Sequence, residues 1–566
     1  MTSLLTKLST LGIDLDSITD TSAREAVTLL FNLIEDVSSE NDQLKAKVQT
    51  LLNEIARLKG EQGKPNIRGK NRNFSSEEER KAKDKDEDKD EDKDEDDTDH
   101  EPAKAKAPKR ERLTITRTQV EPIDKSTLPD DAVFKGYESS LIQDLIISAE
   151  VIEMKRETWY SPSLRRGFTA PMPQGYEGSF GPRLKSVIII LKTLGNMSEP
   201  AITKLMASFG VEISESSIDR ILLKDKQAFH TEKSDIFAAG LVATFYQHTD
   251  DTGARVRGEN YHTHVFCNPF YSAFFTREHK DRLTVLAILS QVKTIAELPC
   301  LWNSEACAIL TALPCSKRFL ALTESLPQEK LLTKTELDQW CEDRGLSKTQ
   351  AKRLFEALAI TAYQARTDIP VVSILMADDA PQFKLLTKEL ALCWIHDGRH
   401  YKKLNPVVGR HRRLLDKFLS EYWKFYHQLL AYKANPGAKE AERLEKRFTQ
   451  LFSTTTGYNM LDDRIAKTKA KQSELLLSLV HPELPLHNNP AELGARAQVR
   501  KRDVSLQTMT AEGTEVLDTF LTIVETAKKL GVNLYDYVFD RVSQTYAMPS
   551  LANTIRLRSG QVTAGP

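Results

Sequence analysis

Five short segments with the composition of β-strands constrain the fold of this chain more than any other feature. The first three follow one another closely, and Asn268-Pro269 joins the second to the third by a short turn. A helical pattern and a long polar stretch separate them from the last two. This order predicts a central sheet flanked by helices. The five segments cover residues 242–250, 261–267, 271–276, 371–378 and 390–394.

The first and fourth segments both end in an acidic residue, Asp250 and Asp378. The order of the five segments is that of a ribonuclease-H-like core, a mixed sheet with flanking helices. In that layout the first and fourth strands lie side by side, so we expect the two carboxylates to meet.

A third acidic residue, Glu492, follows in the segment His487-Asn-Asn-Pro-Ala-Glu492. A helix that begins after Pro490 places Glu492, Arg496 and Arg500 on one face. Carboxylates from distant parts of a chain can hold two Mg²⁺ or Mn²⁺ ions, about 3.5–4 Å apart, for phosphoryl transfer. We therefore predict a metal site in which Asp378 bridges both ions, while Asp250 and Glu492 each hold one.

Each carboxylate also has a purely structural interpretation. The segment Asp250-Asp-Thr-Gly253 is typical of a turn. Asp378 is a suitable N-cap for a following helix. Glu492 can pair with Arg496 one helical turn later. Only the combination of the three favours a metal site.

Residues 23–60 contain a heptad repeat, which predicts a dimeric coiled coil over a domain at 1–60. β-Branched residues at a with mostly Leu at d favour a parallel pair, and one Asn at a fixes the register. The alternative is an amphipathic helix that packs on its own chain. The predicted seam comprises Ile34, Val37, Asn41, Leu44, Val48, Leu51, Ile55 and Leu58.

Three further regions precede the predicted core. Residues 61–110 include a run of Lys, Asp and Glu, which predicts a disordered linker; it serves as a spacer or as a DNA-mimicking arm. Period-2 alternation at 113–120 and 145–155 predicts a small β-rich module over 111–178. Helical patterns at about 183–194, at 198–209 and from 216 predict a helix-turn-helix-like DNA-binding domain over 180–236, although a plain three-helix bundle has the same pattern.

The predicted catalytic domain, residues 240–540, has room for two helical insertions, at about 288–368 and 408–480. A helix is expected from Gly513 to Leu530, and a C-terminal tail over 541–566. The six cysteines form no C-x-x-C pair, and no apolar run is long enough to cross a bilayer. With a polar N-terminus, these features favour a cytoplasmic protein without membrane contact.

Other chemistries have less support. His262, His264 and Cys267 have metal-ligand residue types, but strand alternation places Cys267 on the opposite face from the two histidines, so no zinc is expected. No phosphate-binding Gly-x-x-x-x-Gly-Lys motif and no convincing Gly-x-Ser-x-Gly motif occurs, which disfavours ATPase and hydrolase functions.

The acidic motifs resemble those of bacterial insertion-sequence DDE transposases, most closely the TnpC type of insertion-sequence family sixty-six. The resemblance covers roughly 185–285 and 370–540, and it departs from the family at Leu493, where Arg is usual, and in having no Cys before Cys267. The matching segments are Asp250-Asp-Thr-Gly-Ala-Arg-Val256, Asp378-Asp-Ala-Pro-Gln-Phe383, Cys393-Trp-Ile-His-Asp-Gly-Arg399, Asn488-Asn-Pro-Ala-Glu492 and Glu525-Thr-Ala-Lys-Lys-Leu-Gly531.

The resemblance implies a transposase that cleaves and transfers DNA strands at the terminal inverted repeats of its element. It would use two Mg²⁺ or Mn²⁺ ions and act as a homodimer or higher assembly on nucleoid DNA, with element-encoded accessory proteins as further expected partners. The alternatives are a transposase-derived dimeric DNA-binding protein without activity and a coiled-coil structural protein. Predicted DNA contacts are Arg496, Arg500, Lys501, Arg502, Arg399 and His396.

Overall fold

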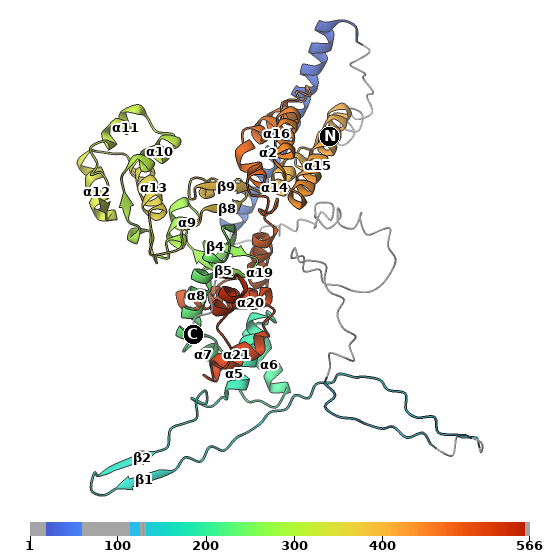
Figure 1. Cartoon of the computed structure of the whole chain (residues 1–566), viewed down its shortest axis with the longest axis vertical. Helices are drawn as coiled ribbons and strands as arrows, with labels where there is room; N and C mark the ends of the chain where they lie inside the picture. The colour runs from blue at the N-terminus through green and yellow to red at the C-terminus, as the bar shows by residue number, and fades with distance from the viewer. Residues whose placement is uncertain (1–17, 59–113, 125–127, 130–131, 561–566) are drawn as a thin grey trace. The chain divides into compact units, whose positions relative to one another are not determined.

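The computed structural model describes residues 18–58, 114–124, 128–129 and 132–560 (Figure 1). The predicted linker at 61–110 lies outside these residues. The chain divides into two compact units. Of the described residues, unit 1 comprises 18–58, 174–198 and 221–560, and unit 2 comprises 114–124, 128–129, 132–173 and 199–220. No helix among the described residues has the length and apolar character needed to cross a membrane.

A five-stranded mixed sheet lies at the centre of unit 1, in the order β5-β4-β3-β8-β9. β3, β4 and β5 form an antiparallel meander, whereas β8 and β9 run parallel to β3. The first and fourth predicted strands are therefore neighbours, as expected. The strands are β3 (Tyr246–Val256), β4 (Glu259–Asn268), β5 (Tyr271–Arg277), β8 (Ile374–Ala377) and β9 (Glu389–Leu392).

Several strand boundaries differ from the prediction. Helix α8 (Gln227–Ala243) covers the predicted start of β3, and the strand continues past Asp250 to Val256. β4 pairs with β3 continuously from His248 to Val256. The hydrogen bonds between these two strands hold the Asp-Asp-Thr-Gly segment in an extended conformation, so this segment forms no turn. The fifth strand stops at Leu392, because Cys393 Sγ accepts the N–H of His396 and begins a helix there.

Helix α20 (Ala511–Lys529) closes the β5 edge of the sheet with side-chain hydrogen bonds. The N–H groups of Ser272, Phe274 and Thr276 donate in turn to Thr526 Oγ1, Thr522 Oγ1 and Asp518 Oδ2. These three acceptors are four residues apart and so share one helix face. The helix lies within a residue or two of its predicted position, 513–530.

Further helices pack around this core. α9 (Arg282–Leu289) follows β5, and α21 (Leu534–Val542) packs against α5 (Pro182–Thr193). α22 (Leu551–Arg558) packs against α8, so the predicted tail at 541–566 contains a helix.

Both predicted insertions are largely helical and appear as separate groups in Figure 1. The first contains α10 (Ser304–Ala312), α11 (Lys317–Thr323), α12 (Lys334–Asp343) and α13 (Lys348–Gln364), with a small hairpin of β6 (Cys300–Leu301) and β7 (Leu331–Leu332). The second packs around the buried Trp394 and contains α15 (Gly409–Ala434), α16 (Ala438–Leu451), α17 (Asn459–Lys469) and α18 (Gln472–Leu475).

The N-terminal helix α2 (Thr21–Leu58) has two different halves. In the first half, the buried Glu35 carboxylate accepts the N–H groups of Val407 and Val408 at 2.9–3.1 Å and contacts His411 Nδ1 at 3.2 Å. The expected alternative, packing on its own chain, thus holds for this half, where Ile34 joins an apolar cluster. The seam continues as Val37, Leu44, Val48, Leu51 and Ile55, all exposed, while the side chain of Leu58 is outside the described part.

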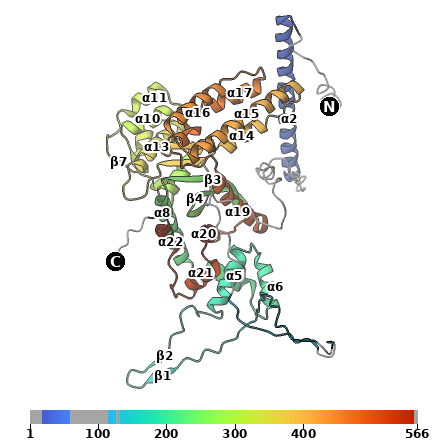
Figure 2. The same cartoon turned by 45° about the vertical axis from the view of Figure 1, so that its right-hand side comes forward.

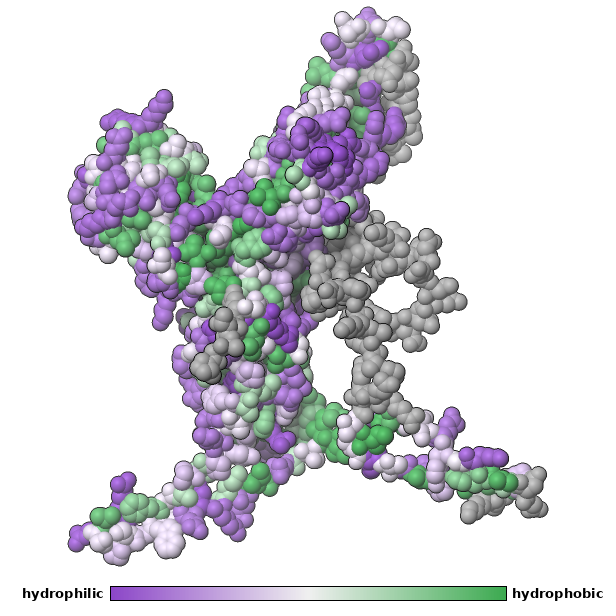
Figure 3. Space-filling model, viewed as in Figure 1, coloured by the Kyte–Doolittle hydropathy of each residue, from purple (hydrophilic) through white to green (hydrophobic). Residues whose placement is uncertain are grey.

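Unit 2 differs from the predicted β-rich module. Its strands are β1 (Thr158–Ser161) and β2 (Arg166–Thr169), a short hairpin. The predicted strands at 113–120 and 145–155 do not form over their described residues, because alternation alone supplies no hydrogen-bonded partner. Ile146 and Val151 are more than 90% exposed there, and Figure 3 shows hydrophobic residues at this surface.

The three helices predicted over 180–236 are present but are divided between the units. α5 belongs to unit 1, whereas α6 (Glu199–Ser208) and most of α7 (Glu215–Leu223) belong to unit 2. The helix-turn-helix assignment therefore stays a prediction.

Candidate active site at the end of the parallel strands

The register of the sheet brings Asp250 and Asp378 to the same level. β3 and β8 are parallel, and His248 lies opposite Met376. Each acid lies two residues beyond its member of that pair. Since neighbouring strands are about 4.8 Å apart, the two carboxylates occupy one small region.

The two carboxylates are poorly compensated. Burial raises the pKa of Asp250 to about 7, and the charges of Asp378, Asp251 and Glu492 add to this rise, against a hydrogen bond from the Asp251 N–H. Burial likewise raises the pKa of Asp378, which accepts the N–H of Ala380 at 3.1 Å. Among the described residues, no Lys or Arg forms an ion pair with either acid.

Asp251 and Asp379, the acidic residues that directly follow Asp250 and Asp378, each have a basic or hydrogen-bonding partner for their negative charge. Asp251 accepts from Gln382 Nε2 at 2.7 Å and lies 3.4 Å from Lys280 Nζ. Asp379 pairs with Lys384 at 2.9 Å and with Lys471. Burial alone would raise the pKa of Asp379, but the hydrogen bonds from the two lysines outweigh it and lower that pKa. In each of the two Asp-Asp pairs, the first carboxylate thus has no ion-pair partner among the described residues, whereas a lysine lies within ion-pair distance of the second.

Glu492 lies in the first turn of α19 (Asn489–Ser505), which packs on β3 and β4 (Figure 2). Both carboxylate oxygens accept from Arg399 at 3.1 Å, and His396 Nδ1 lies 3.5 Å away. Arg399, rather than the suggested Arg496, is the ion-pair partner. Both His396 and Arg399, predicted as DNA contacts, are therefore engaged with Glu492.

A buried asparagine joins the segments that carry these groups. Asn488 Nδ2 donates to the Thr249 carbonyl at 2.8 Å, and Asn488 Oδ1 lies 2.9 Å from His248 Nδ1. Burial lowers the pKa of His248 to about 3, so the ring is neutral and its Nδ1–H is the donor. The Asn488 N–H also donates to Cys393 Sγ at 3.2 Å. Asn488 belongs to the sequence motif that carries Glu492, but nothing in that motif predicts this role.

The basic face of α19 is only partly available to a ligand. Arg496 and Arg500 are exposed, and Arg502 donates to the Gly253 carbonyl at 2.6 Å. Lys501 is buried, its Nζ donates to the Lys192 carbonyl at 2.5 Å, and burial lowers its pKa to about 7. We therefore withdraw Lys501 from the predicted DNA contacts.

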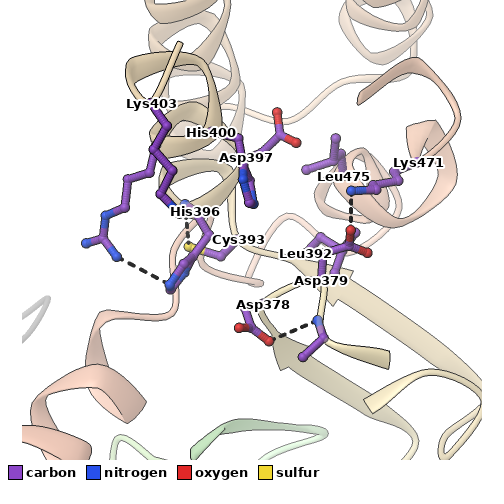
Figure 4. A pocket seen from close by; sticks show the side chains of 12 residues that line it. Asp378, Asp379, Leu392, Cys393, His396, Asp397, His400, Lys403, Lys471 and Leu475 are labelled. Atoms are coloured by element: carbon purple, nitrogen blue, oxygen red, sulfur yellow. Dashed lines mark hydrogen bonds and ion pairs between the residues drawn. The ribbon is translucent and has the colours of Figure 1, made fainter. Parts of the chain in front are cut away.

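A pocket of about 430 Å³ opens beside Asp378 (Figure 4). One wall is the helix α14 (Trp394–Lys402), and Lys471 lies on another. Its lining residues are Asp378, Asp379, Ala380, Leu392, Cys393, His396, Asp397, Arg399, His400, Lys403, Lys471 and Leu475.

The donor set of this site fits a divalent ion only in part. Asp250 and Asp378 suit one, since they are hard oxygen donors whose mutual repulsion a cation relieves. Within the described residues, however, no group of three acidic, His or Cys side chains is arranged to hold a metal ion. The ion pair with Arg399 occupies both oxygens of Glu492, the expected third ligand.

A relative of this chain is known from Sinorhizobium fredii. No family model matches the chain. It is 31% identical over 306 residues to the uncharacterized protein y4jO of Sinorhizobium fredii, an alignment that covers 54% of this chain and 94% of that protein.

Proposed function

This chain belongs to the same family as the Sinorhizobium fredii protein y4jO, and from its acid site we propose that it is a metal-dependent enzyme that cleaves and transfers DNA strands. The observation that carries the proposal is the pair Asp250 and Asp378, buried on adjacent strands without a cation. A site that concentrates negative charge in this way favours a divalent ion over a structural role.

The strand order supports a ribonuclease-H-like core, and the sequence motifs support a DDE transposase of the TnpC type. Asp250 and Asp378 would hold Mg²⁺ or Mn²⁺, and Glu492 would join them once released from Arg399. A bound ion of this kind lowers the pKa of water and stabilises charge on phosphate oxygens. The substrate would be the terminal inverted repeats of an insertion sequence.

The chain's own residues would position the DNA. Arg496 and Arg500 extend from α19 next to Glu492, where they can contact phosphates and give a salt-dependent affinity. The exposed seam of α2, from Val37 to Ile55, supports association of two protomers, which would hold two element ends together.

The test is cleavage of a labelled duplex that carries the element's ends, with Mg²⁺ or Mn²⁺. We expect Asp378→Asn to reduce the cleavage rate by about a thousandfold or more, equivalent to about 4 kcal/mol of activation free energy. The matched control is Asp379→Asn, which alters the adjacent but lysine-paired acid and should retain cleavage.

The pairing of Glu492 with Arg399 favours a second candidate, a dimeric DNA-binding protein without catalysis. If the wild-type chain binds these ends but shows no metal-dependent cutting, this second function replaces the first.

A further inference from the structure

Four side chains of α14 and its C-cap face one pocket. His396, Arg399, His400 and Lys403 are spaced i, i+3, i+4 and i+7, which places them on one helix face. All four line the pocket beside Asp378, and Lys471 adds a further basic side chain (Figure 4). The helix therefore presents a basic stripe directly next to the acid site.

Most charges in this pocket already have partners. Lys471 pairs with Asp379, and Arg399 with Glu492. Asp397 is buried and pairs with Arg464, and it also accepts from Tyr422 and Thr468. Its negative charge is therefore compensated from outside the pocket.

Three side chains of this lining have no ion-pair partner among the described residues, namely the acid Asp378 and the basic residues His400 and Lys403. In the part of the chain that the structure describes, no hydrogen bond or ion pair engages the side chain of His400 or Lys403. Burial lowers the pKa of His400, and the charges of Arg464, Lys403 and Lys471 lower it further against Asp397 alone. Lys403 therefore adds an unpaired positive charge and His400 a neutral hydrogen-bonding ring at the end of the pocket that Figure 4 shows away from Asp378, and the two together suit an anion.

The size and walls of the pocket narrow the choice of anion. Its volume of about 430 Å³ exceeds what a bare phosphate needs and lies in the usual range for small organic ligands. Leu392 and Leu475 provide apolar wall. A phosphate that carries a sugar matches this combination of cations and apolar surface.

We propose that this pocket binds one nucleotide unit of a DNA strand, with its phosphate on His400 and Lys403, and that this phosphate competes with Glu492 for Arg399. Arg399 has five N–H donors in a fork that fits phosphate and carboxylate equally well. Transfer of Arg399 to the phosphate releases Glu492 toward Asp250 and Asp378. Binding of the strand thereby completes the acid set, an inference that rests on the proposed function.

The experiment measures Mn²⁺ binding to the full chain by calorimetry, with and without a single-stranded DNA tetranucleotide. We expect the tetranucleotide to tighten Mn²⁺ binding about tenfold, and Mn²⁺ to tighten tetranucleotide binding by the same factor. Arg399→Gln should bind Mn²⁺ about tenfold more tightly than wild type even without DNA, because Glu492 is already free. A weaker affinity in this variant would show that Arg399 supports the metal site, and would overturn the competition.

A double variant, His400→Asn with Lys403→Gln, tests the pocket itself. It should lose about tenfold in tetranucleotide affinity while its Mn²⁺ affinity without DNA stays at the wild-type value. The matched control is Lys446→Gln, which removes an exposed lysine on α16 that pairs with Glu442. Thermal unfolding and circular dichroism verify that each variant is folded. Wild-type tetranucleotide affinity in the double variant would overturn the phosphate site.

Two further arms separate the remaining outcomes. Titration with inorganic phosphate and with a deoxynucleoside 5′-monophosphate tests the source of the phosphate; a monophosphate that binds as tightly as the tetranucleotide would overturn the DNA-strand assignment. If no variant binds Mn²⁺ but the tetranucleotide still depends on His400 and Lys403, the proposed metal chemistry fails while the phosphate pocket stands.

Discussion

Two regions of this molecule bury carboxylates and treat them in opposite ways. Where α2 meets α15, Glu35 receives two backbone N–H groups and contacts the His411 ring. Where the parallel pairing of β3 with β8 ends, Asp250 and Asp378 each accept a single backbone N–H, and the charge of Asp378 acts on Asp250.

The number of hydrogen-bond partners distinguishes Glu35, a structural carboxylate, from Asp250 and Asp378, which are available for chemistry. Burial of a charge is costly unless hydrogen bonds or opposite charges offset it. The junction at Glu35 provides that offset from its own chain, so the contact holds α2 in place. The pair at Asp250 and Asp378 lacks it, so the site keeps a capacity for an added cation.

The largest expected effect is the loss of the Glu35 carboxylate. Glu35→Ala leaves two N–H groups and His411 buried without their partner, which should weaken the docking of α2 by about 3–5 kcal/mol. Hydrogen–deuterium exchange of residues 21–36 would report this as faster opening. Asp36→Ala, on the exposed side of the same turn, is the control and should change exchange little. Unchanged exchange in Glu35→Ala would mean that the apolar contacts alone hold the helix.

The second prediction is a gain in stability, expected when the Asp250 carboxylate is removed. Because the pKa of Asp250 is raised to about 7, the folded chain binds a proton that the unfolded chain has released, so stability falls as pH rises from about 4 to 7. Asp250→Asn removes this loss and should stabilise the metal-free protein at pH 8 by roughly 4 kcal/mol, since the pKa rises from 3.8 to about 7 and each pKa unit corresponds to about 1.4 kcal/mol.

Thermal unfolding in a chelator at pH 5 and pH 8 measures this effect. The gain in Asp250→Asn should be larger at pH 8 than at pH 5. An equal gain in stability at pH 5 and pH 8 would show that the surroundings of Asp250 do not raise its pKa. Added Mn²⁺ should stabilise the wild-type chain and have little effect on the variant.

The smallest effect is expected at Asp379. Its two lysine partners are partly exposed, and such ion pairs contribute about 1 kcal/mol or less. Asp379→Asn should therefore change the unfolding free energy by under about 1 kcal/mol and the Mn²⁺ affinity by less than about threefold. Calorimetry beside Asp378→Asn provides the measurement. An equal loss of Mn²⁺ affinity in both variants would remove the distinction between the paired and the free acid.

The sheet was largely predictable because its strands carry their own signal. Apolar β-branched and aromatic runs identified β4, β5 and β8, and the order of segments identified the neighbours β3 and β8. The end of β3 was predicted wrongly, since Asp250-Asp-Thr-Gly253 has turn residues and only the pairing with β4 keeps it extended. In unit 2 the same alternation predicted strands at 113–120 and 145–155 that find no partner.

The acid site was predictable as residue types but not as partners. The position of Asp250 opposite Asp378 follows from strand order. The pairing of Glu492 with Arg399, and the clamp from Asn488 to His248 and Thr249, depend on how α14 and α19 pack, which no local pattern encodes. The spacing of the basic residues from His396 to Lys403 on α14 and its C-cap can be seen in the sequence, whereas the pocket that these side chains line cannot.

The hydrogen bonds from α20 to the β5 edge have a consequence for synthesis of the chain. The N–H of Ser272 can donate to Thr526 Oγ1 only after 254 further residues have been synthesised. At roughly 5–20 residues per second, a ribosome needs on the order of 13–50 s to supply that residue. During this interval the meander of β3, β4 and β5 has an open edge to which another strand can add. Release from the ribosome before α20 emerges would leave that edge open, so α20, in the last tenth of the chain, protects the sheet from aggregation.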